Sequence, residues 1–200
     1  MSTIINYLIE QSKSPAGLGG RILTKIWSTY FQKLSLWTLN LTTIPQSARI
    51  LDIGFGGGIN IQNLTSMTEK STIHGIDISR EAYKQASKVN RQLIQKGQVH
   101  LSLADVTRLP FPDQCFDLIV ATQTHIYWDE LAKGLAECAR VLRKEGKLLI
   151  SSEKDKINYH LPAYSDPNDF VALLNQQGFT KITIKDTPSY IGFICQKKQS

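Results

Sequence analysis

Two kinds of apolar pattern alternate along most of this chain. Short segments rich in β-branched and aliphatic residues are typical of strands buried on both faces of a sheet. They lie at residues 50–53, 71–77, 98–103, 116–121 and 147–150, with two closing strands expected at 179–185 and 190–196. Between them, apolar residues recur every three or four positions, which predicts helices. These lie at residues 59–67, 80–97, 129–143 and 169–177. Strands and helices in alternation predict a parallel sheet covered on both sides.

A purely helical pattern precedes this alternation. We expect a short helix at residues 3–11, a Pro- and Gly-containing hinge at 12–20 and a longer helix at 21–41 whose aromatic residues share one stripe. This stripe packs against the edge of the sheet or closes over a ligand, in which case Tyr30 contacts the substrate. We expect one domain at 1–200, with residues 1–44 as a helical cap or lid and residues 45–200 as the core.

Composition indicates an ordinary globular protein, because 42% of the residues are hydrophobic and 20% are charged. No apolar run approaches the roughly 20 residues that cross a bilayer, and the first residues lack a basic leader, so we expect a cytoplasmic protein. Three widely spaced cysteines in apolar surroundings predict reduced core residues and no disulfide framework. They are Cys115, Cys138 and Cys195.

The net charge of +6 is concentrated near the amino terminus. Residues 1–50 hold five Lys or Arg and one Glu, which gives 5 − 1 = +4. This excess could attract an anionic substrate, a membrane surface or RNA. The basic residues form no run, so we favour a solvated helix face and expect no nucleic-acid partner.

A glycine-rich turn follows the first buried strand, in the stretch RILDIGFGGG at residues 49–58. Its glycines lack Cβ atoms, so a ligand can lie against the main chain where the next helix begins. A dinucleotide fold expects G-x-G-x-x-G, but position 59 is Ile. Asp52, just before the turn, suits a cationic amino group better than a pyrophosphate. The turn therefore indicates S-adenosylmethionine.

Two more carboxylates follow the second and third strands. Asp77 occupies the position from which an acidic residue binds two ribose hydroxyls. Its alternative role is to cap the next helix, but Ser79 is better placed for that. Asp105 follows the third strand and could accept from an adenine amino group. Because parallel strands end at the same edge of a sheet, we expect these carboxylates to surround one ligand.

Candidate groups for the reaction follow the fourth strand. They are Gln123, Thr124, His125, Tyr127 and Trp128. His125 and Tyr127 are the candidate catalytic residues, since an unperturbed histidine has a pKa near 6.5 and can act as a general base. His125 could equally be a hydrogen-bonded loop residue. His160, after the fifth strand, could reach the same cleft. His125 and Asp129 lie four residues apart, but two ligands without a third predict no metal site.

Four segments together resemble the core of a class I S-adenosylmethionine-dependent methyltransferase of the type 11, or UbiE-like, group. They are LDIGFGGG at 51–58, HGIDIS at 74–79, ADVTRLPFPDQCFDLIVA at 104–121 and ECARVLRKEGKLLIS at 137–151. The resemblance implies an α/β fold, a Rossmann-like three-layer sandwich with a seven-stranded, mostly parallel sheet in the order 3-2-1-4-5-7-6 and an antiparallel last strand. It also implies S-adenosyl-L-methionine as cofactor and S-adenosyl-L-homocysteine as product.

The same resemblance assigns cofactor-binding positions. The acid and glycines of the turn hold the methionine part, the second acid the ribose, the third acid the adenine, and a carbonyl of the fourth strand the amino group. The residues are Asp52, Gly54, Phe55, Gly56, Gly58, Asp77, Ile78, Asp105, Val106 and Ala121. Phe55 departs from the family, which has a small residue there, and could tighten the pocket or turn outward toward the substrate.

The function implied is methyl transfer to a small-molecule acceptor by in-line displacement. The protein has to hold a nucleophile in line with the methyl carbon, and a base is needed only for a protonated acceptor. Gln123, Thr124, Trp128, Tyr30 and His160 are the predicted substrate-binding residues. The alternatives are an RNA or protein methyltransferase, and a non-catalytic protein that binds S-adenosylmethionine or a dinucleotide. The sequence leaves open whether the protein is a monomer or a homodimer.

Overall fold

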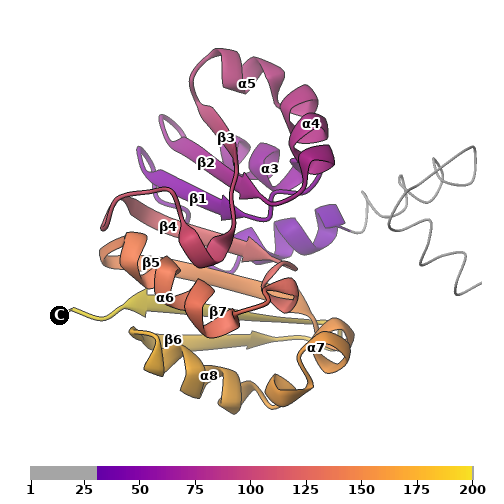
Figure 1. The fold of residues 1–200 in the computed structure, drawn as a ribbon, viewed down its shortest axis with the longest axis vertical. Helices are drawn as coiled ribbons and strands as arrows, with labels where there is room; N and C mark the ends of the chain where they lie inside the picture. Colours follow the sequence, from indigo (N-terminus) through magenta and orange to yellow (C-terminus); the bar gives the residue numbers. More distant parts are fainter. Residues whose placement is uncertain (1–30, 200) are drawn as a thin grey trace, which may run out of the picture.

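A computed structural model describes residues 31–199 of the chain. Within this range seven strands form one sheet in the order β3-β2-β1-β4-β5-β7-β6 (Figure 1). The strands are β1 (Arg49–Ile53), β2 (Thr72–Asp77), β3 (Val99–Leu103), β4 (Phe116–Thr122), β5 (Leu142–Glu153), β6 (Phe179–Asp186) and β7 (Tyr190–Lys197). The helices are α3 (Ile59–Met67), α4 (Arg80–Val89), α5 (Arg91–Gln95), α6 (Leu131–Val141), α7 (Lys154–His160) and α8 (Pro167–Gln176). Short 3-10 turns are η1 (Val106–Arg108), η2 (His125–Tyr127) and η3 (Pro162–Tyr164).

The sheet confirms the predicted fold class and strand order. Strands β1 to β5 pair in parallel, whereas β7 is antiparallel to both β5 and β6. Asp52 of β1 pairs with Gly75 of β2, and Asp77 at the end of β2 pairs with Leu103 of β3. The carboxyl ends of β1, β2 and β3 therefore meet at one edge, where ligands bind in sheets of this kind.

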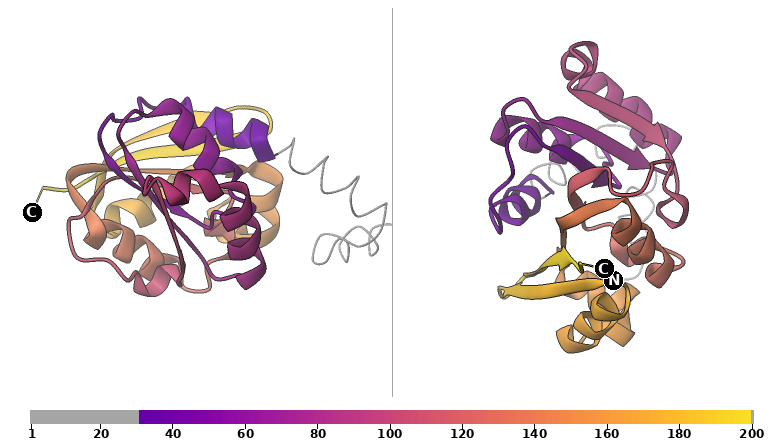
Figure 2. Two further views of the ribbon diagram at one scale, coloured as in Figure 1. Left: turned by 90° about the horizontal axis from the view of Figure 1, so that it is seen from above. Right: turned by 90° about the vertical axis from the view of Figure 1, so that its left-hand side faces the viewer.

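Alternating side chains of the central strands enter two separate hydrophobic clusters. Leu51 and Ile53 of β1 pack on one face with residues of α6 and α8. Ile50 packs on the other face with residues of α3 and α4. Figure 2 shows the helix at residues 31–39 on the side of the sheet opposite to α6 and α8. Burial on both faces explains why these strands are almost continuously apolar.

Of the helix expected at 21–41, the structure describes a helix at residues 31–39. Leu34 and Leu39 are completely buried, and Leu39 belongs to the cluster that contains α3. The ring of Trp37 lies 5.4 Å from that of Tyr190 on β7. This part of the predicted cap therefore packs on the sheet. The rest of the cap, including Tyr30, lies outside the described residues, and the lid remains a prediction.

The predicted secondary structure differs from the observed one in three places. The helix expected at 80–97 is two helices, because Asn90 leaves helical geometry and its side-chain amide donates to the carbonyls of Gly58 and Ala86. Strand β5 begins at Leu142, which pairs with Phe116, so the helix expected to end at Arg143 ends at Val141. Helix α7 was not predicted, because only Ile157 of its seven residues is buried and no apolar period is visible.

The three cysteines are free and buried, as the sequence predicted. Burial raises the pKa of the Cys195 thiol to about 12. The pKa of Cys138 also rises, mainly because it is buried. Such thiols pack as small hydrophobic side chains. Within residues 31–199, no helix combines the length and apolarity that a membrane span requires.

Candidate cofactor and substrate site

A cavity of about 980 Å³ lies at the carboxyl ends of the central strands. It is bounded by the glycine turn after β1, the ends of β2 and β4, and the segments that carry η1 and η2. The structure brings eleven of the sequence-predicted site residues to its wall. They are Gly54, Phe55, Gly56, Asp77, Ile78, Asp105, Val106, Gln123, Thr124, Tyr127 and Trp128.

The glycine turn needs glycine for two reasons. Gly54, Gly56 and Gly58 have φ angles of 73°, 50° and 86°, a region that other residues rarely adopt. Two of them also have close neighbours. A Cβ on Gly54 would lie 2.4 Å from Cγ2 of Thr124, and one on Gly58 would lie 2.4 Å from Nδ2 of Asn90. Gly58 thus lets α4 approach the start of α3, although Gly58 itself does not line the cavity.

Asp77 holds the glycine turn as well as lining the cavity. Its Oδ2 accepts from the backbone amide of Gly56 at 2.9 Å, and its Oδ1 accepts from the amide of Ser79 at 2.8 Å. The hydroxyl of Ser79 accepts from the amide of Ala82 and caps α4. Asp77 therefore does not serve as the cap. A carboxylate has about four acceptor positions, so Asp77 retains the capacity to bind ligand hydroxyls.

Asp105 and Val106 line the same cavity. Oδ1 of Asp105 accepts from the amide of Thr107 at 2.7 Å, which starts the turn η1. The side chain of Val106 is buried and contributes an apolar surface. A flat apolar surface beside a hydrogen-bonding carboxylate suits a purine ring.

Asp52 is buried behind the cavity wall, where only 1% of its surface is exposed. Its Oδ1 accepts from Nδ2 of Asn60 at 2.6 Å, and Oδ1 of Asn60 accepts from the hydroxyl of Ser35 at 2.6 Å. Asn60 and Ser35 line the cavity, but Asp52 does not. Asn60, which the sequence analysis did not single out, thus connects Asp52 to the cavity wall, and the contact of Asp52 with a ligand stays a prediction.

The second oxygen of Asp52 gives this carboxyl group unusual chemistry. Oδ2 is buried and has no hydrogen-bond partner among the described residues. Burial raises the pKa of Asp52 to about 7, opposed by the hydrogen bond from Asn60 and assisted by the negative charge of Asp77. An unpartnered buried carboxylate oxygen is costly unless it is protonated or meets a cation. This carboxyl group is therefore stabilised either by holding a proton or by a positive charge nearby.

The charged residues on the cavity wall are all acidic. They are Asp77, Glu81, Asp105, Asp129 and Glu130. None of the described residues that line the cavity is Lys, Arg or His. Glu81 and Glu130 pair with Lys84 and Lys133 at 2.8 and 3.0 Å, so the negative field comes mainly from the three aspartates. Such a field attracts cations and repels anions such as pyrophosphate.

Gln123 is fixed at the end of β4 by four hydrogen bonds. Its backbone amide donates to the carbonyl of Ser151 at 2.8 Å, and its Oε1 accepts from Ser152 Oγ at 3.0 Å and Glu153 N at 2.9 Å. Its Nε2 donates to Oε2 of Glu153 at 2.8 Å. These bonds hold Gln123 at a φ of 60°, which is uncommon for a residue other than glycine. The remaining proton of the amide is available to a ligand.

The outer part of this wall is aromatic. Tyr127 lies on η2, is 57% exposed and has its ring 4.8 Å from that of His160 on α7. Burial of the hydroxyl end and the charge of Glu153 raise the pKa of Tyr127, so its phenol stays protonated at neutral pH. Trp128 also lines the cavity, whereas His160 contacts it only through Tyr127.

His125 is not brought to this cavity. Only 2% of its surface is exposed, and it lines a separate small cavity. Burial lowers the pKa of His125 to about 3, so the imidazole is neutral at physiological pH. This position does not support the predicted role of general base. The side chain of Ala121 is likewise buried and does not line the large cavity.

The ring of Phe55 does not turn outward toward a substrate. Phe55 is buried in the cluster that contains α3, where its Cδ1 would lie 2.9 Å from a Cβ on Gly75. Gly75 on β2 thus leaves room for the ring. Phe55 lines the cavity, and its buried ring holds the glycine turn against the hydrophobic cluster.

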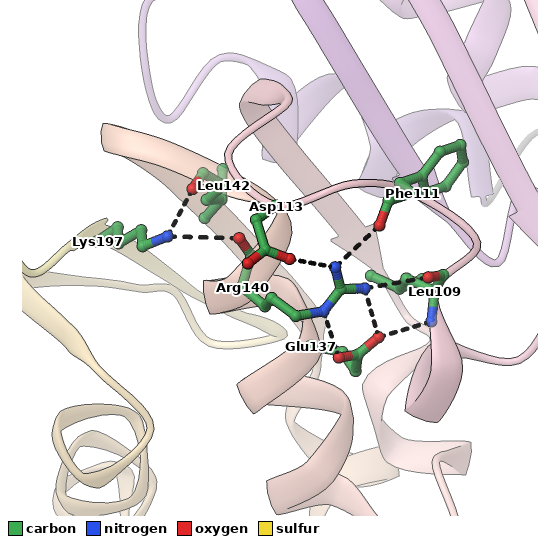
Figure 3. A network of polar contacts seen from close by, with 7 residues as sticks. All are labelled: Leu109, Phe111, Asp113, Glu137, Arg140, Leu142 and Lys197. Atoms are coloured by element: carbon green, nitrogen blue, oxygen red, sulfur yellow. Dashed lines mark hydrogen bonds and ion pairs between the residues drawn. The ribbon is translucent and has the colours of Figure 1, made fainter.

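Arg140 on α6 fastens the segment that follows Asp105 (Figure 3). Its guanidinium donates to the carbonyls of Leu109 and Phe111 at 3.1 and 2.9 Å and pairs with Asp113 at 2.7 Å. It also pairs with Glu137, which accepts from the amide of Leu109 at 2.8 Å. The hydrogen bond from Arg140 lowers the pKa of Glu137. One side chain of α6 therefore positions the segment that continues from Asp105.

No group of three or more metal-ligating His, Cys, Asp or Glu side chains occurs among residues 31–199. His125 and Asp129, which lie four apart in the sequence, do not line the same cavity. The absence of a metal requirement stays a prediction.

The fold and the motifs together define a methyltransferase class. Residues 51–150 match the family described as "Methyltransferase domain". The chain therefore belongs to this family, in its type 11 group, as the four sequence segments indicated. A crystal structure described as a SAM dependent methyltransferase from Aquifex aeolicus has the same fold, with a TM-score of 0.70, 20% sequence identity, and coverage of 84% of this chain and 97% of that chain.

Two curated relatives illustrate the range of similar proteins. The protein of Bacillus subtilis (strain 168) named "Uncharacterized methyltransferase YdaC" is 30% identical over 122 residues, which cover 61% of this chain and 65% of the relative. A Pyrenophora dematioidea protein named "O-methyltransferase" is 27% identical over 177 residues, which cover 82% of this chain and 66% of the relative. The matches thus span just under two thirds of the length of these relatives.

Proposed function

We propose that this protein transfers a methyl group from S-adenosyl-L-methionine to a hydroxyl of a small, uncharged molecule. The observation that carries this proposal is the cavity itself. It has a glycine turn at one end, five acidic side chains on its wall, and no basic side chain among the described residues that line it. S-adenosylmethionine has positive sulfonium and ammonium groups and one carboxylate, so its net charge is positive and the field of such a wall attracts it.

The cofactor is assigned to the wall between the glycine turn and η1. Asp77 binds the ribose hydroxyls, while Asp105 and Val106 bind the adenine. The glycine turn receives the amino acid part, whose ammonium group is attracted by the buried carboxyl group of Asp52. A nicotinamide dinucleotide fits less well, because its pyrophosphate would face carboxylates. When bound, the cofactor supplies a methyl group that is already activated by the sulfonium sulfur.

The acceptor is assigned to the wall formed by the residues after β4. Ligand cavities in proteins range up to about 1,000 Å³, so a cavity of about 980 Å³ has room for a cofactor and a small acceptor together. Gln123 offers one amide proton to the acceptor oxygen, and Tyr127 and Trp128 offer aromatic surfaces. A preorganised donor of this kind aligns the oxygen for in-line attack. Relatives named O-methyltransferase support oxygen as the atom methylated.

Removal of the proton from the acceptor hydroxyl is assigned to the two acidic residues that follow Trp128. Asp129 and Glu130 line the cavity next to Trp128, whereas His125 lies in another cavity. Tyr127 keeps its proton at neutral pH, since its pKa is raised. It therefore serves as a hydrogen-bond donor. An anionic acceptor is disfavoured by the same carboxylates that attract the cofactor.

Calorimetry tests the cofactor half of the proposal. We expect S-adenosylmethionine and S-adenosylhomocysteine to bind, and NAD to bind much more weakly. Asp77→Ala should weaken cofactor binding at least tenfold, whereas Asp155→Ala, at an exposed position on α7, should leave it unchanged. Tight binding of NAD with neither sulfur ligand would overturn the proposal.

Product detection tests the acceptor half. The purified protein is incubated with isotope-labelled cofactor and a metabolite extract, and products that gain one methyl group are identified. We expect O-methylated, uncharged compounds of low molecular mass. Labelled RNA, with activity that falls steeply as salt is added, would instead indicate a nucleic-acid substrate.

A further inference from the structure

A second, smaller cavity of about 150 Å³ lies among η2, α7, η3, α8 and β7. None of the described residues that line it also lines the large cavity. Its inner wall is formed by apolar and aromatic side chains. They are Ile157, Leu161, Tyr164, Phe170, Ile191 and Phe193, with His125 at one end.

The rings of this wall are already arranged in the way that aromatic side chains favour. The centroid of Phe170 lies 4.8 Å from that of Phe193, 5.8 Å from that of Tyr164 and 5.5 Å from that of His125, with tilted or edge-on planes. A further ring that enters the cavity can adopt the same geometry. An apolar protein cavity of roughly 150 Å³ accommodates benzene, so the size is sufficient for one six-membered ring.

His125 contributes a polar side chain to this apolar lining. Its Nδ1 is buried and has no hydrogen-bond partner among the described residues. Buried polar atoms are normally paired, and each exception calls for an explanation. Burial keeps the imidazole neutral, so it carries one donor and one acceptor nitrogen and can pair with a hydroxyl in either direction.

The outer end of the cavity determines which charge a ligand can have. The exposed side chains of Asn158 and Ser165 line the cavity, which therefore reaches the surface. Nζ of Lys154, at the same end, pairs with Oδ1 of Asp186 at 2.9 Å and Oδ2 at 3.1 Å. The two charges offset each other. An uncharged ligand therefore fits better than an ionised one.

We propose that this cavity is a second ligand site, for a small neutral aromatic molecule with one hydroxyl, whose hydroxyl forms a hydrogen bond with Nδ1 of His125. The site is distinct from the cofactor and acceptor cavity and does not depend on the reaction proposed above. His125 and Tyr127 belong to the same turn, η2. A ligand bound beside His125 therefore contacts the same turn that carries Tyr127, which lines the large cavity.

Two probes of nearly the same size test the proposal in the full-length protein. Phenol has the hydroxyl and toluene does not, and binding of each is measured by NMR titration. We expect the wild type to bind phenol at least as tightly as toluene. In His125→Phe, which keeps an aromatic ring, we expect phenol binding to fall about tenfold and toluene binding to change less than twofold. In Leu161→Trp, which fills the cavity, both probes should bind much more weakly.

A spectroscopic measurement separates the hydrogen bond from a change in cavity shape. Phenol should shift the imidazole ¹⁵N resonances of His125 in the wild type, and toluene should not. Phenol that binds more weakly than toluene in the wild type, or phenol binding that is unchanged in His125→Phe, overturns the proposal. If His125→Phe loses both probes, the ¹⁵N shifts of the wild type decide, and their absence overturns it.

Discussion

The buried carboxyl group of Asp52 makes a specific prediction about stability and pH. Its Oδ2 has no partner within the described residues, and its Oδ1 accepts from Asn60. Asp52→Asn keeps the shape of the side chain and an oxygen for the bond from Asn60, but it removes the charge. We expect the variant to be more stable than the wild type at pH 8 and to bind the cofactor poorly.

The magnitude follows from the pKa. Burial raises the pKa of Asp52 from 3.8 to about 7. Between these two values the folded protein holds a proton that the unfolded chain has released, so the stability of the wild type falls as pH rises through this window. Each tenfold change in proton affinity corresponds to about 1.36 kcal/mol, so the full loss is roughly 4 kcal/mol. The Asn variant lacks this loss. The two proteins should therefore match near pH 4 and differ by up to roughly 4 kcal/mol at pH 8.

Urea denaturation at pH 4.5, 6 and 8 measures this difference directly. Asp155→Asn, at an exposed position, controls for the removal of one negative charge. Adding S-adenosylhomocysteine at 100 times its Kd should restore about 2.7 kcal/mol to the wild type at pH 8 and far less to Asp52→Asn. Unfolding free energies that run parallel from pH 4.5 to pH 8 in the wild type and Asp52→Asn would refute the reasoning.

Further predictions concern the glycine turn and the segment that Arg140 fastens. Gly54→Ala and Gly56→Ala both place alanine at positive φ, at a cost of about 1–2 kcal/mol, but only Gly54→Ala meets a neighbour, Cγ2 of Thr124 at 2.4 Å. Thermal unfolding should show a larger loss for Gly54→Ala, partly recovered by Thr124→Ser; equal losses would contradict the clash. Arg140→Met should cost about 2–3 kcal/mol in urea denaturation and weaken cofactor binding, whereas Arg143→Met, which loses one half-exposed ion pair, should cost less than about 1 kcal/mol. Equal costs would mean that Arg140 does not hold the segment.

The sheet could be predicted because its strands are buried on both faces. Ile50 and Leu51 enter different clusters, so both faces of β1 are covered by apolar side chains. A run of this kind is visible in the sequence without knowledge of its neighbours. Local pattern and final burial agree here, and the strand order followed from the resemblance to a known family.

The helix break that the sequence did not predict depends on a contact between distant residues. Nothing in the pattern of residues 80–97 marks Asn90 as a break. The helix ends there because the amide of Asn90 reaches the carbonyl of Gly58, 32 residues earlier in the chain. An interaction of this type exists only once the sheet has brought α3 and α4 together, so periodicity cannot reveal it.

The position of a side chain at the cavity could be predicted where a strand end fixes it, and could not where a turn or a helix face decides it. Asp77 and Asp105 follow strands and line the cavity, whereas His125 lies on a 3-10 turn that directs it elsewhere. The sequence does contain a signal for Asn60, which is a polar residue in the first turn of the helix that follows the glycine turn. Its burial becomes meaningful only once Ser35 is known to lie beside it.

The hydrogen bonds that hold Gln123 in place restrict which substitutions can change the acceptor specificity of this protein. Its strained backbone and its side-chain amide are both tied to the end of β5, so a substitution there would disturb two strands at once. Tyr127 is 57% exposed and lies on the turn η2, outside the sheet. Natural variation or laboratory selection for new acceptors should therefore accumulate at Tyr127 and Trp128 and leave Gln123 untouched.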